Sequence, residues 1–231
     1  MAIFDIDGNV IAVGGGDSRT LPNIALMGDS ITDITDHGWW VDTMCSIASV
    51  KSIRNYAVGG VTWGGILAQF NRLKADTDAG QIAPDVVFIM AGTNDATAGT
   101  TCGDVETVFD DTDILSKTPS NMAEHIRYVC ESILTAYPTV QLVLATPIQT
   151  GAVAKKTKME EIAQCIRDCA AKLSATLIDA YAEAGIYGYM ESIGDVFLSD
   201  NTHPSKTVGS EHLGRYMAQQ FLNKVYNARV W

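Results

Sequence analysis

One segment, Ile24-Ala-Leu-Met-Gly-Asp-Ser-Ile31, indicates both the fold of this chain and a candidate nucleophile. Its four leading apolar residues predict a strand buried on both faces, because such strands lose the alternation of polar and apolar side chains. Gly28-Asp29-Ser30 follows directly, and beyond it apolar residues recur at helical spacing. The glycine permits a sharp turn, and the N-terminus of the next helix places a positive dipole beside the serine. Such a strand-to-helix turn presents a serine hydroxyl as a nucleophile in α/β enzymes, although the tripeptide alone has little specificity.

The same alternation of buried strand and amphipathic helix continues along the chain. Short apolar strands are predicted at 52–56, 85–90, 140–145 and 176–179. Apolar residues at helical spacing predict helices around 40–48, 66–73, 122–133, 159–173 and 213–225. Five strands that alternate with helices predict an α/β fold with one parallel sheet covered on both faces. The acidic and polar segment 97–119 is predicted to be a long loop that helps to shape a site.

Composition excludes several classes of protein. The chain has 231 residues, of which 47% are hydrophobic, so it is not a disordered chain and can form a core. Its net charge of −11 argues against nucleic acid or an anionic membrane as a general partner. No apolar run approaches the roughly 18 residues that a transmembrane helix needs, and no signal peptide is visible. Localisation stays open: we expect cytoplasmic synthesis, with a particle component or an excised domain as alternatives.

The five cysteines are odd in number and lack the paired spacing of metal ligands. We therefore expect buried free thiols rather than disulfides, and no metal site. These residues are Cys45, Cys102, Cys130, Cys165 and Cys169.

Residues 1–20 differ from the rest of the chain. The segment from Phe4 to Val13 alternates apolar residues around Asp7-Gly8-Asn9, which predicts a β-hairpin, and the glycine-rich segment 14–20 predicts a flexible tether. A calcium-binding loop around Asp5, Asp7 and Asn9 is the weaker alternative, because the glycine comes too early for an EF-hand. We expect residues 1–20 to form a hairpin and tether that can dock another module, and residues 21–231 to form the main domain.

Polar residues gather where the predicted strands end, which in a parallel sheet is the edge that holds the active site. A serine hydroxyl such as that of Ser30 needs a base to take its proton, and His203 is the candidate. Asp200, three residues earlier, can turn back to hold the other ring nitrogen of His203. The backbone N–H groups of Ser30 and Gly60 and the side-chain amide of Asn94 are candidate donors to a developing oxyanion. These residue types point to acyl transfer.

The four motifs together resemble those of the SGNH (GDSL-type) hydrolase superfamily in order and approximate spacing. They are Gly28-Asp-Ser30, Asn55-x-Ala-x-x-Gly60, Gly92-x-Asn-Asp95 and Asp200-x-x-His203, and the resemblance spans about residues 22–226. Ala57 stands where the second motif often has glycine. The resemblance implies a flavodoxin-like three-layer α/β/α sandwich that acts on esters or thioesters without metal or organic cofactor.

By this resemblance Ser30 is the nucleophile, His203 the base and Asp200 the residue that orients it, with Ser30, Gly60 and Asn94 as the oxyanion hole. The expected activity is hydrolysis of carboxylic esters through an acyl-enzyme, with O-acetyl groups on carbohydrate as the favoured substrate. A lysophospholipase or thioesterase is the alternative within the same chemistry. A non-catalytic glycan-binding or particle-joining module on the same fold is the alternative from another class.

Several residues beside these motifs have an ordinary structural interpretation. Asp29 and Asp95 are expected to support their loops rather than to act as acid or base. His37 is interpreted as a loop histidine, with a place at the lip of the substrate site as the alternative. Trp39, Trp40 and Trp63 are candidates for an aromatic platform, with core packing expected for at least one of them.

Overall fold

The computed structural model describes residues 3–4, 10–11, 21–190 and 196–225. Its centre is a parallel sheet with the strand order β4-β3-β5-β6-β7. The first strand of this sheet, β3, lies between β4 and β5, so the chain reverses its direction of progress at β3. Ligands bind at such a switch point in open α/β sheets. The strands are β3 (Asn23–Gly28), β4 (Ser52–Asn55), β5 (Val86–Met90), β6 (Gln141–Ala145) and β7 (Thr176–Ile178).

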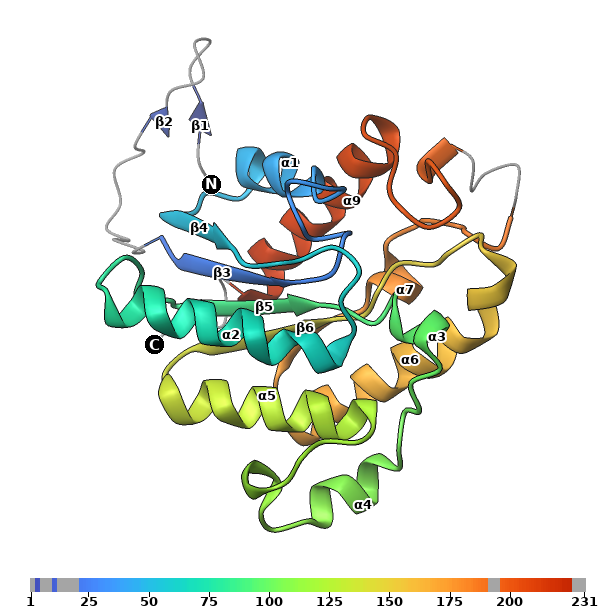
Figure 1. The fold of residues 1–231 in the computed structure, drawn as a ribbon. Helices are drawn as coiled ribbons and strands as arrows, with labels where there is room; N and C mark the ends of the chain where they lie inside the picture. The colour runs from blue at the N-terminus through green and yellow to red at the C-terminus, as the bar shows by residue number, and fades with distance from the viewer. Residues whose placement is uncertain (1–2, 5–9, 12–20, 191–195, 226–231) are drawn as a thin grey trace.

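Helices cover both faces of this sheet, which confirms the predicted three-layer α/β/α sandwich (Figure 1). One face carries α1 (Trp40–Ile47) and α9 (Val208–Gln220), which continues into the π-helical segment η2 (Phe221–Val225). The other face carries α2 (Trp63–Asp78), α5 (Met122–Ala136) and α6 (Val153–Lys172). The shorter elements are α3 (Asp95–Ala98), α4 (Val105–Asp110), η1 (Ile114–Ser116) and α7 (Ala180–Glu183).

Strand β5 shows why the apolar runs do not alternate. Val87 and Ile89 pack with α2, α5 and α6, whereas Val86, Phe88 and Met90 pack with α1 and α9. All five side chains are fully buried. A strand with helices on both faces has no solvent side, so each of its residues is apolar.

The prediction of a long loop at 97–119 is wrong, because this segment contains the end of α3, all of α4 and η1. Asp104 caps α4 by accepting a hydrogen bond from the Glu106 N–H (3.2 Å). Val108 and Ile114 are buried and anchor the segment. With so few apolar residues, these short helices show no clear periodicity in the sequence.

The N-terminal hairpin is described only in part. β1 (Ile3–Phe4) pairs antiparallel with β2 (Val10–Ile11), as expected for the arms of a hairpin, and neither strand joins the five-stranded sheet. The turn Asp7-Gly8-Asn9, Asp5 and the tether 14–20 lie outside the described residues.

The cysteines agree only in part with the prediction of buried free thiols. All five lie in the described part of the chain as free thiols, but Cys45 and Cys102 are only partly buried. Within the same part, no helix has the length and apolar character that crossing a bilayer requires. Trp40 and Trp63 are fully buried in the core, so only Trp39 is left for a platform.

Candidate active site

Ser30 lies in a tightly packed turn at the carboxyl end of β3. Gly28 has φ +156°, and a Cβ at this position would lie 2.2 Å from the Met90 carbonyl oxygen, so only glycine fits. The buried Gln69 side chain of α2 accepts a hydrogen bond from the Gly28 N–H (2.9 Å) and donates one to the Gly28 carbonyl (2.8 Å). The strand end that presents Ser30 is therefore held from both its neighbouring strand and its covering helix.

Asp29 supports this turn from inside the protein, as expected from the sequence. Its carboxylate accepts hydrogen bonds from the backbone N–H groups of Ile31 (3.1 Å) and Thr93 (3.3 Å). Burial raises the pKa of Asp29 to about 6, although these hydrogen bonds and that of the Thr93 side chain oppose the rise. Asp95 is also fully buried and accepts a hydrogen bond from the Trp63 N–H (3.1 Å), which joins its loop to the start of α2.

Ser30, His203 and Asp200 form a continuous hydrogen-bonded line. Ser30 Oγ lies 2.7 Å from His203 Nε2, and His203 Nδ1 lies 2.7 Å from Asp200 Oδ2. The other oxygen of Asp200 accepts hydrogen bonds from the backbone N–H groups of Thr202 (3.0 Å) and His203 (2.8 Å). Partial burial opposes ionisation of Asp200, but the hydrogen bonds from His203 outweigh it and hold the pKa of this carboxyl below its usual range. The line joins a hydroxyl to a carboxylate through an imidazole, an arrangement suited to proton transfer.

The other two predicted oxyanion donors come from the loops after β4 and β5. Gly60 lies in the turn before α2 with φ +79°, a conformation that favours glycine. Asn94 precedes α3 and donates one amide hydrogen to the Val61 carbonyl (2.9 Å), which leaves its second amide hydrogen unused by this bond. Among the residues that the structure describes, no hydrogen bond engages the N–H of Ser30 or of Gly60.

Hydrogen bonds also join the β4 loop to the nucleophile loop. Asn55 donates its side-chain amide to the Thr32 carbonyl (2.7 Å) and accepts a hydrogen bond from the Ala57 N–H (3.0 Å). Asp33 accepts a hydrogen bond from the Gly59 N–H (3.1 Å). The position of Gly60 is therefore coupled to that of Ser30.

His37 belongs to this site, contrary to its interpretation as an ordinary loop histidine. Its ring is stacked on that of His203, with centroids 4.0 Å apart and an angle of 18° between the planes. The nearness of His37 to Ser30 in sequence is the only signal that could have placed it here.

His37, Asp200 and His203 offer three potential metal-ligand atoms that lie within 4.8 Å of one another. Both ring nitrogens of His203 are, however, within hydrogen-bond distance of Ser30 and Asp200. A metal ion held by His203 would have to replace one of these contacts. The arrangement therefore suits proton transfer better than metal binding.

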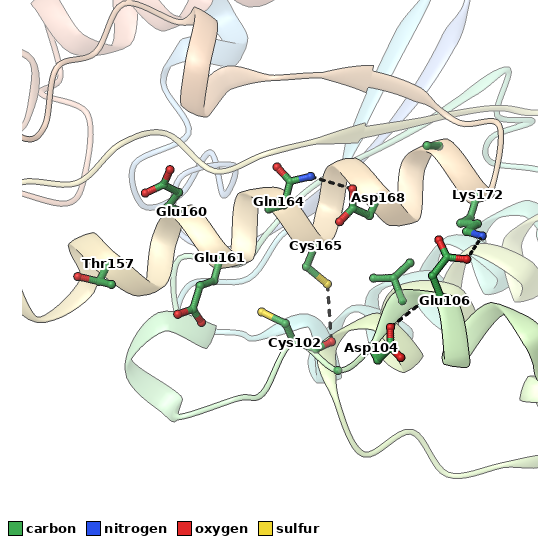
Figure 2. Close-up of a pocket in the computed structure, with 13 residues that line it drawn as sticks. Cys102, Asp104, Glu106, Thr157, Glu160, Glu161, Gln164, Cys165, Asp168 and Lys172 are labelled. Atoms are coloured by element: carbon green, nitrogen blue, oxygen red, sulfur yellow. Dashed lines mark hydrogen bonds and ion pairs between the residues drawn. The ribbon is translucent and has the colours of Figure 1, made fainter.

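A cavity of about 820 Å³ lies away from this line of residues, between α6 and the segment 102–106 (Figure 2). Its charged residues are acidic except for Lys172, which forms an ion pair with Glu106 (2.5 Å). The Cys165 thiol donates to the Cys102 carbonyl within it (3.7 Å). Ser30, Asp200 and His203 are not among the residues that line this cavity.

Solved structures with the same fold come from several bacteria. A Lactobacillus plantarum protein is 18% identical (TM-score 0.69) over 88% of this chain and 97% of that one. A lipase/acylhydrolase from Enterococcus faecalis is 22% identical (TM-score 0.59) over 88% of this chain and 96% of that one. A mutant of an acetyl-xylooligosaccharide esterase from Geobacillus stearmophilus is 20% identical (TM-score 0.57) over 88% of this chain and 93% of that one. At these identities the likeness shows the fold alone.

Among curated protein sequences, none matches this chain. The model of the GDSL-like lipase/acylhydrolase family does match, and it spans residues 26–207, from the nucleophile strand to the loop after His203. With the fold and the hydrogen-bonded serine in agreement, the chain belongs to the GDSL-like lipase/acylhydrolase family of ester hydrolases.

Proposed function

We propose that this ester hydrolase works through Ser30 as nucleophile, His203 as general base and Asp200 as the residue that orients His203. The observation that carries the proposal is the pair of 2.7 Å contacts that joins Ser30 Oγ to His203 and His203 to Asp200. A serine hydroxyl is a weak nucleophile without a base, and this line supplies one. An ionised Asp200 also stabilises the imidazolium that forms when His203 takes the proton.

The reaction then has two steps of the same kind. Ser30 Oγ bonds to the ester carbonyl carbon while its proton passes to His203 Nε2, and the carbonyl oxygen becomes an oxyanion. When the bond to the alcohol breaks, His203 returns the proton to the leaving oxygen and an acyl-Ser30 remains. Water then attacks the acyl group, again with His203 as base, and releases the acid and free Ser30.

The proposed oxyanion hole consists of the Ser30 and Gly60 N–H groups and the Asn94 side chain. Support comes from the backbone donors, which have no hydrogen-bond acceptor among the described residues, and from the second amide hydrogen of Asn94. Each donor of this kind is worth about 3 kcal/mol of barrier.

For the substrate, we propose a short acyl ester on carbohydrate. The Asp200 side chain is 52% exposed, which fits a site open to a bulky polar alcohol. Exposed tyrosines lie on the loop 187–190, whose Gly188 packs against Thr150. Thr150 in turn donates to the carbonyl of Asn201 (2.6 Å), which lies between Asp200 and His203. Aromatic rings on such a rim suit the faces of sugars, and an acetyl-xylooligosaccharide esterase has the same fold.

The first test compares wild type, Ser30→Ala and a matched control, Ser132→Ala, whose serine lies on α5. We expect Ser30→Ala to lower kcat for p-nitrophenyl acetate at least about a thousand-fold, and Ser132→Ala to leave it unchanged. A fluorophosphonate probe should add once to wild type, on Ser30. Wild-type activity in Ser30→Ala would overturn the proposed nucleophile. The absence of both turnover and probe adduct in the wild-type protein would favour the non-catalytic module.

The second test addresses the acyl group. We expect p-nitrophenyl acetate to be a better substrate than the octanoate or palmitate esters, and acetylated oligosaccharides to release acetate. A preference for the long chains would favour the lysophospholipase or thioesterase alternative.

A further inference from the structure

His37 touches both the nucleophile loop and the base. Its backbone N–H donates to the Ser30 carbonyl (3.1 Å), and its ring lies flat on the ring of His203 at a centroid distance of 4.0 Å. The position of His37 is therefore tied to the backbone of Ser30, and the His203 ring rests on it.

The surrounding loop holds His37 firmly. Asp36 Oδ1 lies 2.5 Å from His37 Nδ1, although without the alignment of a regular hydrogen bond. The other Asp36 oxygen packs against Gly59, where a Cβ would approach it to 2.7 Å. A Cβ at Gly38 would lie 2.4 Å from the Thr32 carbonyl oxygen, so glycine allows the two segments of the loop to pack closely. The ring is only 25% exposed and has little freedom to leave the stack.

The stack restrains a motion that the hydrogen bonds of His203 leave free. The contacts at Nδ1 and Nε2 of His203 fix where the ring lies within its own plane. They only weakly resist a rotation of the ring about the axis that joins these two nitrogens. Asp200 cannot supply this restraint, because it lies on the same short loop and moves with His203. A flat side chain against one face of the ring can supply it.

The same contact suits the charged form of His203. When His203 takes the Ser30 proton it becomes a cation, and an aromatic face beside it is favourable. The stack also keeps water from that face of the ring, which strengthens the hydrogen bonds in its plane.

We propose that His37, held by Asp36, is a positioning residue that fixes the plane of the His203 ring for proton transfer from Ser30. This inference rests on the proposed roles of Ser30 and His203. His37 exchanges no proton with substrate in this proposal, so an aromatic ring without nitrogen should replace it.

The test compares His37→Ala, His37→Gln and His37→Phe with wild type, using p-nitrophenyl acetate. We expect His37→Ala and His37→Gln to lower kcat about ten- to a hundred-fold with KM near wild type, because small misplacements of a catalytic group cost this much. His37→Phe should restore kcat to within about threefold of wild type, because it keeps the stack. His125→Ala, on α5, is the matched control and should behave as wild type.

A second readout does not depend on turnover. The low-field proton resonance of the His203 Nδ1–H should broaden or shift in His37→Ala and return in His37→Phe. Wild-type kcat and resonance in His37→Ala would overturn the proposal. Equal losses in the Phe and Ala variants, or a change in KM alone, would also overturn it. Ser30→Ala, run in parallel, separates the two proposals: if it keeps wild-type activity, the proposed function fails, whatever His37 does.

Discussion

At the scale of single residues, Asp200 and His203 form a unit within one short turn. Asp200 accepts hydrogen bonds from two backbone N–H groups of this turn and from the His203 ring, so the same local conformation orients both side chains. The contacts of the His203 ring with Ser30 and with His37 depend on the rest of the fold.

The pH dependence of turnover follows from this unit. Protonated His203 cannot accept the Ser30 proton, so kcat/KM should fall as the pH is lowered. Asp200 adds no second ionisation to this fall, because its hydrogen bonds hold its pKa below the usual range of a carboxyl. We expect kcat/KM for p-nitrophenyl acetate to be lower on the acid side, where His203 is protonated. A flat profile would contradict this.

Asp29 should make the folding stability decrease as the pH rises, whereas turnover is expected to increase. Its pKa is about 6 in the folded chain and 3.8 in the unfolded reference, so the folded state binds more protons between these values. The contribution of Asp29 to stability is therefore present at low pH and lost as the pH rises through about 6, by up to about 3 kcal/mol.

The variant Asp29→Asn isolates this contribution, because an amide does not titrate. The stability of wild type relative to Asp29→Asn, measured by denaturant unfolding, should decrease from about pH 4 to about pH 7. Subtracting the variant cancels the other titrating groups. A difference that stays constant with pH would show that Asp29 is not responsible.

The contacts among Ser30, His203 and Asp200 could be predicted because each residue ends a recognisable strand or lies within a local turn. Their catalytic roles, with those of Gly60 and Asn94, stay predictions. Gln69 and His37 could not be identified in this way. Gln69, 41 positions further along the chain, forms its hydrogen bond with Gly28 from α2. The His37 ring stacks on the His203 ring only after the sheet has assembled. No local pattern encodes either contact.

At the scale of elements, one ion pair ties α6 to the end of β7. Arg167 donates to both oxygens of Asp179 (2.7 and 3.0 Å), and the two side chains are 22% and 15% exposed. Burial of Asp179 opposes its ionisation, but Arg167, together with hydrogen bonds from Thr146 and the Ala182 N–H, holds the pKa of this carboxyl below its usual range. The stabilisation is therefore present near neutral pH and lost as the pH falls through that lowered pKa.

Arg167→Ala should cost about 1–3 kcal/mol of unfolding free energy near neutral pH. For a chain of this size, thermal unfolding should show a decrease in Tm of about 2–4 °C for each kcal/mol. The matched control is Arg215→Ala, whose pair with Glu211 is mostly exposed and should be worth less than about 0.5 kcal/mol. Equal effects of the two substitutions would contradict the importance of the α6–β7 pair.

The five strands and the long amphipathic helices could be predicted, whereas short helices such as α4 and η1 could not. β3, β5 and β6 were found because nearly every residue in them is apolar and buried. α4 and η1 depend on the Asp104 cap and on single buried residues such as Val108 and Ile114. Anchors of that kind become visible only when the neighbouring helix is in place.

At the scale of the whole molecule, the boundary between residues 1–20 and the main domain is a proposal. β1 and β2 pair with each other and not with the five-stranded sheet. We expect a chain lacking residues 1–20 to hydrolyse p-nitrophenyl acetate within about twofold of the full chain, with a similar Tm. A large loss of Tm in that variant would show that the segment belongs to the main domain.

The order in which the site is assembled during synthesis follows from the distance between Ser30 and His203, which are 173 positions apart in the sequence. On the ribosome the nucleophile emerges well before the base, which precedes α9, the helix that packs on α1. A nascent or truncated chain therefore carries Ser30 without the group that activates it. Ester turnover should begin only once translation has passed His203 and the two ends of the domain have met, which makes it a direct reporter of completed folding.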